Sequence, residues 1–346
     1  MKPRAPGSLA AHRGGAGTSW WSWCVAVVVT GGLLGYLVSQ IEPAELVAAA
    51  RDMTPRHFWA FVALLLAGVA ARAVRFRILL GPAVPMPLLT GIVLVRNLFV
   101  DLLPARLGEL SYVYLLTSRA GRRIEEGLAS LMLSVAFDLV ALTPLLLLAL
   151  LTVGSGGAVP VPWLAAAALV LGLVALAGAR VAGPLGRAVA NVVAPEDGSA
   201  RGRRAELGAL IRRTALAIDD AWARRIAVPV LAVSIVVRLC KFGSYFFLVL
   251  AIMGSRGDPA VDLGFFRVFL GVLSAELAAA LPIPTVASFG TFEAAWAFSF
   301  TQLGFTREDA IVSGVVAHAV SQLVEYALGG LALLALLWPR GDKRHA

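Results

Sequence analysis

Residues 97–109 read NLFVDLLPARLGE, an apolar run interrupted by polar and helix-breaking residues. An arginine precedes the run at Arg96, and an acid lies inside it at Asp101. Pro104 removes a backbone donor and stops a helix, and a glycine four residues later allows a tight turn before Glu109. Such breaks and charges are tolerated in lipid only where protein or a wet cavity satisfies them. The stretch therefore predicts a broken or re-entrant helix around a polar site.

A second stretch, far down the chain, has the same order of residues. Glu276 is followed by LPIP at residues 281–284 and by GTFE at residues 290–293. Again an apolar run meets proline, then glycine, then an acid, Glu293. Paired segments interrupted by proline and glycine, one in each half of a membrane protein, are the best sequence indication of a transport site. The two stretches together therefore predict one shared site.

The two stretches also carry a resemblance to a known family. The pattern LPxRxGE at residues 103–109, followed by a basic turn, and the pattern LPIP…GxxE at residues 281–293 resemble the signatures of the lysylphosphatidylglycerol synthetase transmembrane (flippase-like) family. The resemblance runs from about Trp20 to Trp338 and includes no soluble synthase domain. The chain departs from the family pattern at Asp101, where asparagine is usual, and at Phe137, where a basic residue is frequent. The resemblance implies a membrane domain that moves lipid headgroups between leaflets.

Composition places the chain among integral membrane proteins. Of its 346 residues, 59% are hydrophobic and 15% are charged, and the mean hydropathy is +0.83. Several apolar stretches reach the length of about 18 residues that spans a bilayer, so we expect an all-α, polytopic helix bundle. The formal net charge of +9 is what the positive-inside rule produces, and it does not indicate nucleic acid as a partner. The two cysteines, Cys24 and Cys240, lie in apolar helices and form no metal or redox motif.

The predicted organisation is one membrane domain between two tails. A disordered cytoplasmic tail at 1–19 precedes the flippase-like transmembrane domain at 20–338, and a short cytoplasmic tail at 339–346 follows it. The hydrophilic stretch near 200–225 predicts a cytoplasmic amphipathic helix, which either lies on the inner membrane surface or packs on its own protein as a linker. The predicted spans are 20–41, 57–80, 127–153, 163–182, 226–253 and 310–338.

The charges in the loops predict the orientation of these spans. Arginines flank the first hairpin, near 88–103, whereas the loops around 263–303 are slightly acidic. The first hairpin should therefore enter from the cytoplasm and the second from outside, unless 263–303 forms two full spans. Arg72, Arg75 and Arg77 in the span before the first hairpin are expected to reach the headgroups at its cytoplasmic end. This pattern predicts an inverted-topology repeat in the cell membrane with both termini cytoplasmic.

Polar residues inside the spans are the candidate site residues. A charge at the bilayer centre costs about 2.5–3.5 kcal/mol, so it needs a partner or a wet cavity. The alternative to a binding role is a set of ion pairs that tie helices together, for example Asp138 with Arg238. His318 is either a helix-packing residue or part of a proton relay. The candidate substrate-binding residues are Arg96, Asp101, Arg106, Glu109, Asp138, Arg238, Lys241, Arg267, Glu276, Glu293, His318, Gln322 and Glu325.

The candidate residues carry both positive and negative charges, and this mixture indicates the chemistry of a ligand. A lipid phosphate needs arginine or lysine, and a cationic headgroup also needs carboxylates. We therefore expect a flippase-like protein that translocates or handles a phosphate-bearing, or aminoacylated, lipid between leaflets. The alternatives are a membrane scaffold that partners a lipid-modifying enzyme, and a membrane-embedded lipid transferase. The sequence has no HExxH, GxSxG or nucleotide-binding loop, so we expect no enzyme and no cofactor, and it leaves the oligomeric state open.

Overall fold

The computed structural model describes residues 20–103, 108–153, 161–195, 200–254, 263–281, 283 and 285–337, and this part of the chain is helical with no strand. The predicted tails at 1–19 and 339–346 lie outside these residues. In chain order the elements are α1 (Trp20–Val38), α2 (Pro43–Arg51), α3 (Pro55–Leu80), α4 (Met86–Leu102), α5 (Glu109–Ala120), α6 (Ile124–Val153), α7 (Val161–Val193), α8 (Arg203–Ala223), α9 (Ala227–Met253), α10 (Phe265–Ala279), the 3-10 helix η2 (Val286–Ser288), α11 (Thr291–Gln302) and α12 (Arg307–Leu337).

The all-α membrane bundle expected from composition is confirmed. Within the described residues, α3, α6, α7, α9 and α12 are each long and apolar enough to cross a membrane. Segments 27–38 and 43–51 add a sixth crossing if they form one span bent by 86°. The loop expected after residue 41 contains α2, which the sequence analysis missed. Pro43 at the first position of α2 and Glu45 in its first turn favour a helix there.

Both interrupted stretches form pairs of short helices. Helices α4 and α5 are separated at residues 103–108, of which 104–107 lie outside the described part. Helices α10 and α11 have 15 and 12 residues, whereas about 20 are needed to cross a bilayer. Two full spans over 263–303 therefore do not fit. At the tip of this second pair, Ala287 and Gly290 adopt positive φ angles of 50° and 92°, so the chain reverses sharply.

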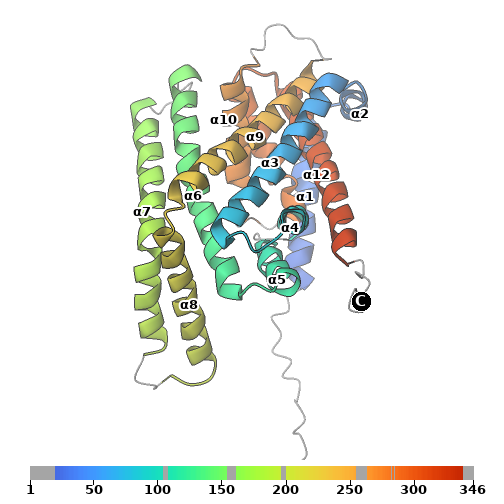
Figure 1. Ribbon diagram of the computed structural model, residues 1–346. Coiled ribbons are helices and arrows are strands. Elements are labelled where there is room, and N and C mark those ends of the chain that lie inside the picture. Colours follow the sequence, from blue (N-terminus) through green and yellow to red (C-terminus); the bar gives the residue numbers. More distant parts are fainter. Residues whose placement is uncertain are drawn as a thin grey trace, which may run out of the picture.

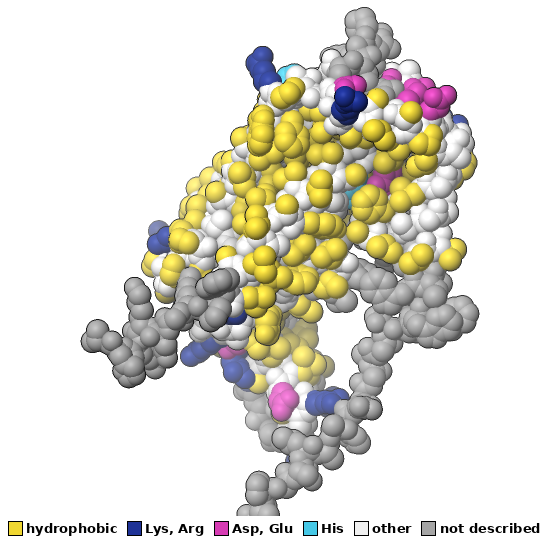
Figure 2. Space-filling view, turned by 90° about the vertical axis from the view of Figure 1, so that its right-hand side faces the viewer, with side chains coloured by type: hydrophobic (Ala, Val, Ile, Leu, Met, Phe, Trp, Pro, Cys, Tyr) yellow, Lys and Arg dark blue, Asp and Glu magenta, His cyan; other side chains and the backbone are white. Residues whose placement is uncertain are grey.

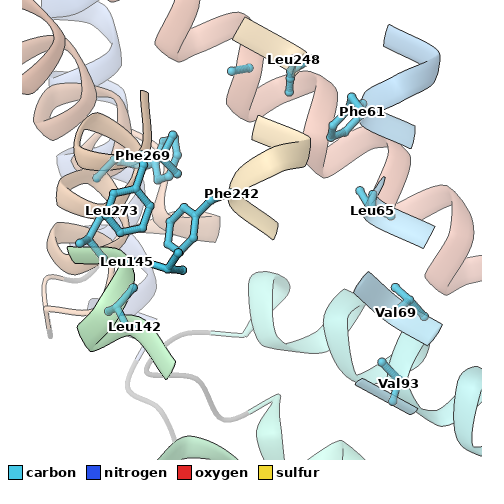
Figure 3. Packing of buried hydrophobic residues seen from close by; sticks show 14 of the residues in the cluster. Phe61, Leu65, Val69, Val93, Leu142, Leu145, Phe242, Leu248, Phe269 and Leu273 are labelled. Atoms are coloured by element: carbon cyan, nitrogen blue, oxygen red, sulfur yellow. The ribbon is translucent and has the colours of Figure 1, made fainter. Parts of the chain in front are cut away.

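The core is formed where α3 and α9 pack side by side and run in opposite directions (Figure 1). Helix α4 packs against α12, and α10 packs against α6. Figure 3 shows Phe242 of α9 beside Leu145 of α6 and Phe269 of α10, and the rings of Phe242 and Phe269 meet edge-on with centres 4.5 Å apart. Elements α3–α6 and α9–α12 thus repeat one order: a long helix, an interrupted short pair and a long helix. The symmetry of an inverted repeat remains a prediction.

Helices α7 and α8 form a separate antiparallel pair beside the core (Figure 1). Helix α7 continues eleven residues past the predicted end at 182, because α8 covers its lower half. The apolar face of α8 is buried on α7 and α6: Ile218 is 1% exposed, and Trp222 donates through Nε1 to the carbonyl of Ala179 at 2.8 Å. The guanidinium of Arg180 lies 4.5 Å from the Trp222 ring centre. Of the two alternatives for this helix, the structure therefore shows the one packed on its own protein.

The outer surface is apolar around the middle of the molecule. Figure 2 shows hydrophobic side chains covering most of one face, with Lys, Arg, Asp and Glu gathered toward its two ends. Large exposed apolar residues on α7 include Leu173 at 64% and Val192 at 78%. Exposed apolar surface of this extent would be unfavourable in water, and it is what hydrocarbon chains accommodate.

A close crossing of α4 and α12 provides a test of this packing. A Cβ added at Gly329 would lie 2.6 Å from Cβ of Leu98 and 3.0 Å from the carbonyl oxygen of Leu94, whereas one at Gly330 would meet nothing within 4 Å. Small residues allow membrane helices to approach closely. We expect Gly329→Ala to destabilise the protein by roughly 1–3 kcal/mol through overpacking, and Gly330→Ala to leave it unchanged or slightly more stable. Thermal unfolding of the purified variants in detergent measures the difference, and equal melting temperatures would contradict this packing.

Candidate functional site

A cavity of about 820 Å³ lies between the two interrupted helix pairs. Apolar residues of α3, α6 and α10 form part of its wall, and polar residues of seven helices point into it. Most of the candidates from the sequence meet here. The charged and polar lining residues include Arg72, Arg96, Asn97, Glu109, Asp138, Arg238, Lys241, Tyr245, Glu276, His318, Gln322 and Glu325.

The first interrupted pair is joined by an ion pair across its break. Arg96 lies in the second half of α4, and Glu109 is the first residue of α5. The guanidinium binds the carboxylate in bidentate fashion, with Nε to Oε2 at 2.6 Å and Nη2 to Oε1 at 2.5 Å. Bidentate pairs of this kind fix geometry as well as charge. The contact therefore holds α4 and α5 together across the interruption between the two helices.

Asp138 of α6 is held between two arginines. Its nearer partner is Arg75 of α3, at 2.5 and 3.3 Å, and Arg238 of α9 lies at 3.4 Å. Arg75 also donates to Ser234 of α9 at 3.2 Å. The pair of Asp138 with Arg238 was an alternative in the sequence analysis, but Arg75 was missed. The expectation that Arg75 reaches the headgroups is wrong: its side chain is 2% exposed and points into the bundle.

Two charges on the cavity wall have no countercharge of their own. Lys241 is paired with Glu276 at 2.7 Å, which links α9 to α10. Arg72 donates to the neutral side chain of Asn97 at 2.7 Å and makes no ion pair within the described residues. Glu325 of α12 makes neither a hydrogen bond nor an ion pair with any residue that the structure describes, and it lines the same cavity. Among the described residues that line the cavity, Arg72 and Glu325 are thus a cation and an anion without a direct ion pair.

The tip of the second interrupted pair contains the most deeply buried acid. Glu293 is 0% exposed, and its Oε2 accepts the backbone N–H of Gly290 at 2.6 Å, as in a capping box at the start of α11. Its Oε1 lies 2.6 Å from Nδ1 of His318 on α12. Nε2 of His318 lies 3.0 Å from Nε2 of Gln322, one turn further along α12. These contacts place Glu293 behind His318, with no exposed surface of its own.

The surroundings of this tip hold it rigidly. The ring centres of Phe289 and Phe292 lie 4.3 and 4.4 Å from that of His318. The backbone N–H of Val286 donates to Oγ1 of Thr30 on α1 at 2.8 Å. Aromatic packing and a hydrogen bond from α1 therefore fix the position of the imidazole.

Of the candidates, Glu293 lies behind His318 and does not line this cavity, and three others are not placed at it by the described structure. Arg267 lies in the first turn of α10, at the outer end of that helix, and donates to the carbonyl of Leu303 at 3.5 Å. The side chain of Asp101 and all of Arg106 lie outside the described residues. Within the described part of the chain, no group of three His, Cys, Asp or Glu side chains is placed to hold a metal ion.

Fold and cavity together define a multi-pass α-helical membrane protein with a charged chamber between two interrupted helix pairs. The chain belongs to the lysylphosphatidylglycerol synthase TM region family, whose model matches residues 23–329. Neither the curated proteins nor the solved structures contain a match. The family ties the protein to the handling of membrane lipids and confirms the resemblance seen in the two sequence patterns.

Proposed function

We propose that the protein translocates a phosphate-bearing lipid between the two leaflets, and that the headgroup passes through the central cavity while the acyl chains stay in the bilayer. The observation that carries this proposal is the cavity itself, a chamber of about 820 Å³ with charges of both signs inside an apolar bundle. A phosphate crosses hydrocarbon slowly because its desolvation is uncompensated. A charged chamber supplies that compensation.

The free charges favour a headgroup that carries both signs. Arg72 can bind a phosphate without giving up an ion pair, because its only hydrogen-bond partner among the described residues is the neutral Asn97. Glu325 can likewise receive an ammonium group. The other lining charges among the described residues are engaged in ion pairs, as in the pair of Lys241 with Glu276. Zwitterionic and aminoacylated phospholipids fit this arrangement better than purely anionic ones.

An orientation in the membrane follows from the same proposal. Arg122, at the turn between α5 and α6, donates to the carbonyl of Leu80, and Arg224, just after α8, donates to the carbonyl of Leu79. Both arginines therefore gather at the C-terminal end of α3. Positive charge concentrates on cytoplasmic ends. We infer that this end faces the cytoplasm of the cell membrane, with both termini on that side.

Transport is tested in proteoliposomes that contain a headgroup-labelled lipid and an impermeant quencher outside. Labelled phosphatidylglycerol, phosphatidylethanolamine and lysyl-phosphatidylglycerol are compared. We expect Arg72→Gln to slow every lipid by about tenfold, equivalent to ~1.4 kcal/mol. Glu325→Gln should slow only the two amine-bearing lipids by a similar factor. Arg56→Gln, an exposed change on the same helix as Arg72, is the matched control and should have no effect.

The proposal would be contradicted if none of the three labelled lipids crossed the bilayer faster with the protein than in empty liposomes. The protein would then be better explained as a scaffold for a lipid-modifying enzyme. Equal slowing of all three lipids by Glu325→Gln would retain transport but remove the assignment of Glu325 to the amine.

A further inference from the structure

A chain of three side chains connects the sealed interior to the cavity. Glu293 has no exposed surface, His318 is 3% exposed and lines the cavity, and Gln322 lines it one helical turn away. Nδ1 of His318 is 2.6 Å from the Glu293 carboxylate, and Nε2 is 3.0 Å from the side-chain nitrogen of Gln322. With Nδ1–H donating to the carboxylate, the Nε2 lone pair accepts from the Gln322 amide. The imidazole is neutral in this arrangement.

The neutral arrangement leaves a buried net charge. The carboxylate of Glu293 is stabilised by the N–H of Gly290 and by the N-terminus of α11, but its only side-chain partner among the described residues is the imidazole. A proton on Nε2 of His318 would turn the pair into an imidazolium facing a carboxylate, with no net charge. Burying a single charge costs far more than burying a hydrogen-bonded pair. The site therefore has a physical reason to take up one proton.

Gln322 supplies a second hydrogen-bond arrangement for the protonated state. Its Oε1 is buried and has no hydrogen-bond partner within the described residues. An unsatisfied buried oxygen costs about 1–3 kcal/mol. If the amide turns by half a rotation, Oε1 comes to the position that Nε2 occupies and accepts the new N–H of the imidazolium. His318 and Gln322 thus have one hydrogen bond between them available for each protonation state of His318.

The other charged groups that face this chain are held by partners or stay apart from it. On α4 and α5, Arg96 is bound to Glu109, and on α9 and α10, Lys241 is bound to Glu276. Asp138 of α6 lies between Arg75 and Arg238. Arg72 of α3 and Glu325 of α12 also face the cavity. Arginine, lysine, aspartate and glutamate ordinarily keep their charge between pH 5 and 8, whereas histidine ordinarily changes its charge there.

We propose that Glu293, His318 and Gln322 form a proton-binding site, and that the proton it takes from water in the cavity drives lipid movement. The step is a simple transfer: a hydronium ion gives its proton to the lone pair on Nε2 of His318 and becomes water, and no covalent bond of the protein breaks. This inference has two halves: that the three residues bind a proton (the binding half), and that this proton drives lipid movement (the coupling half). The coupling half rests on the proposed transport function, and the binding half does not.

The binding half is tested by nitrogen-15 NMR of the histidine rings in lipid nanodiscs. The His318 signals are assigned as those missing in His318→Gln, and a chain with His12, His57 and His345 replaced by Gln isolates them should that variant fold poorly. We expect acidification to change the Nε2 signal from an unprotonated to a protonated form. In Gln322→Leu this change should be weakened, because the new N–H loses its side-chain acceptor. Ring signals that stay constant on acidification in the wild type would overturn the proposal.

The coupling half is tested by transport of labelled phosphatidylethanolamine and lysyl-phosphatidylglycerol in phosphatidylcholine vesicles with a pH difference of two units. We expect the initial rate to differ about tenfold between the two gradient directions. This difference should be smaller in Gln322→Leu and kept in Arg56→Gln. Equal rates in both directions would overturn the coupling. If His318 titrates but no lipid moves, the proposed transport fails with the coupling, and the proton site stands.

Discussion

Replacing Arg75 by methionine is expected to reduce sharply the amount of folded protein in the membrane. The side chain is 2% exposed and provides the nearest contact to Asp138, at 2.5 Å, as well as a hydrogen bond to Ser234. Without it, Asp138 keeps only Arg238 at 3.4 Å. Removing one partner of a buried ion pair costs up to about 3–5 kcal/mol, and this variant loses the shorter of the two contacts to Asp138 together with the hydrogen bond to Ser234. A loss of that size is enough to unfold a marginally stable protein.

The measurement is membrane accumulation together with thermal unfolding in detergent. Arg77→Met removes an arginine of the same helix that makes no buried ion pair in the described structure, so it should behave as the wild type. The triple variant Arg75→Met/Asp138→Leu/Arg238→Met removes all three charges of the cluster and should recover much of the loss. If Arg75→Met accumulates and melts like Arg77→Met, the three-residue cluster does not support the fold.

Glu109→Gln and Glu293→Gln are each expected to abolish lipid movement while the protein stays folded. The reasons differ. Glu109→Gln leaves Arg96 without its countercharge and frees the arms of the first interrupted pair. Glu293→Gln keeps the size of the side chain and removes the charge that His318 faces. Each loss should exceed about tenfold, or ~1.4 kcal/mol, in the rate of headgroup passage.

The quencher assay in proteoliposomes measures both variants beside Glu206→Gln, an exposed change on α8 far from the cavity. Size-exclusion profiles and melting temperatures establish that the proteins are folded. The double variant Arg96→Gln/Glu109→Gln removes both members of one ion pair. It shows whether the effect of Glu109→Gln comes from the loss of the ion pair or from the unpaired Arg96. If both glutamine variants fail to accumulate, the carboxylates serve the fold rather than the transport site.

The interrupted helices were predictable because their causes are local. Proline removes a backbone donor wherever it stands, and a glycine before an acid permits a tight turn and a helix start, as at Gly290 and Glu293. The fold class and five of the spans follow from apolar length alone. Helix α2 and the lower half of α7 did not follow, because α2 is too short for an apolar pattern and α7 continues through packing on α8.

The partners of the charged residues were not predictable, because they depend on how helices pack. Arg72 and Arg75 near the end of an apolar span would equally suit the headgroup region, and only the packing of α3 against α9 turns Arg75 toward Asp138. The same holds for Arg267, whose place on the outer turn of α10 keeps it from the cavity. His318 and Gln322 were recognised as one face of α12, but the link from His318 to Glu293 spans two helices.

Helix α7 determines the direction in which the second half of the chain first crosses the bundle. Elements α3–α6 begin and end at the same end of the bundle, because α3 and α6 each traverse it once (Figure 1). The single further traverse by α7 makes α9 start from the opposite end, antiparallel to α3. If α6 were joined directly to α9, the chain would cross the bundle one time fewer between them. Helix α9 would then run parallel to α3, and both interrupted pairs would start from the same end of the bundle. Among the described helices, α7 lines no part of the cavity, yet its traverse places the starts of the two interrupted pairs at opposite ends of the bundle.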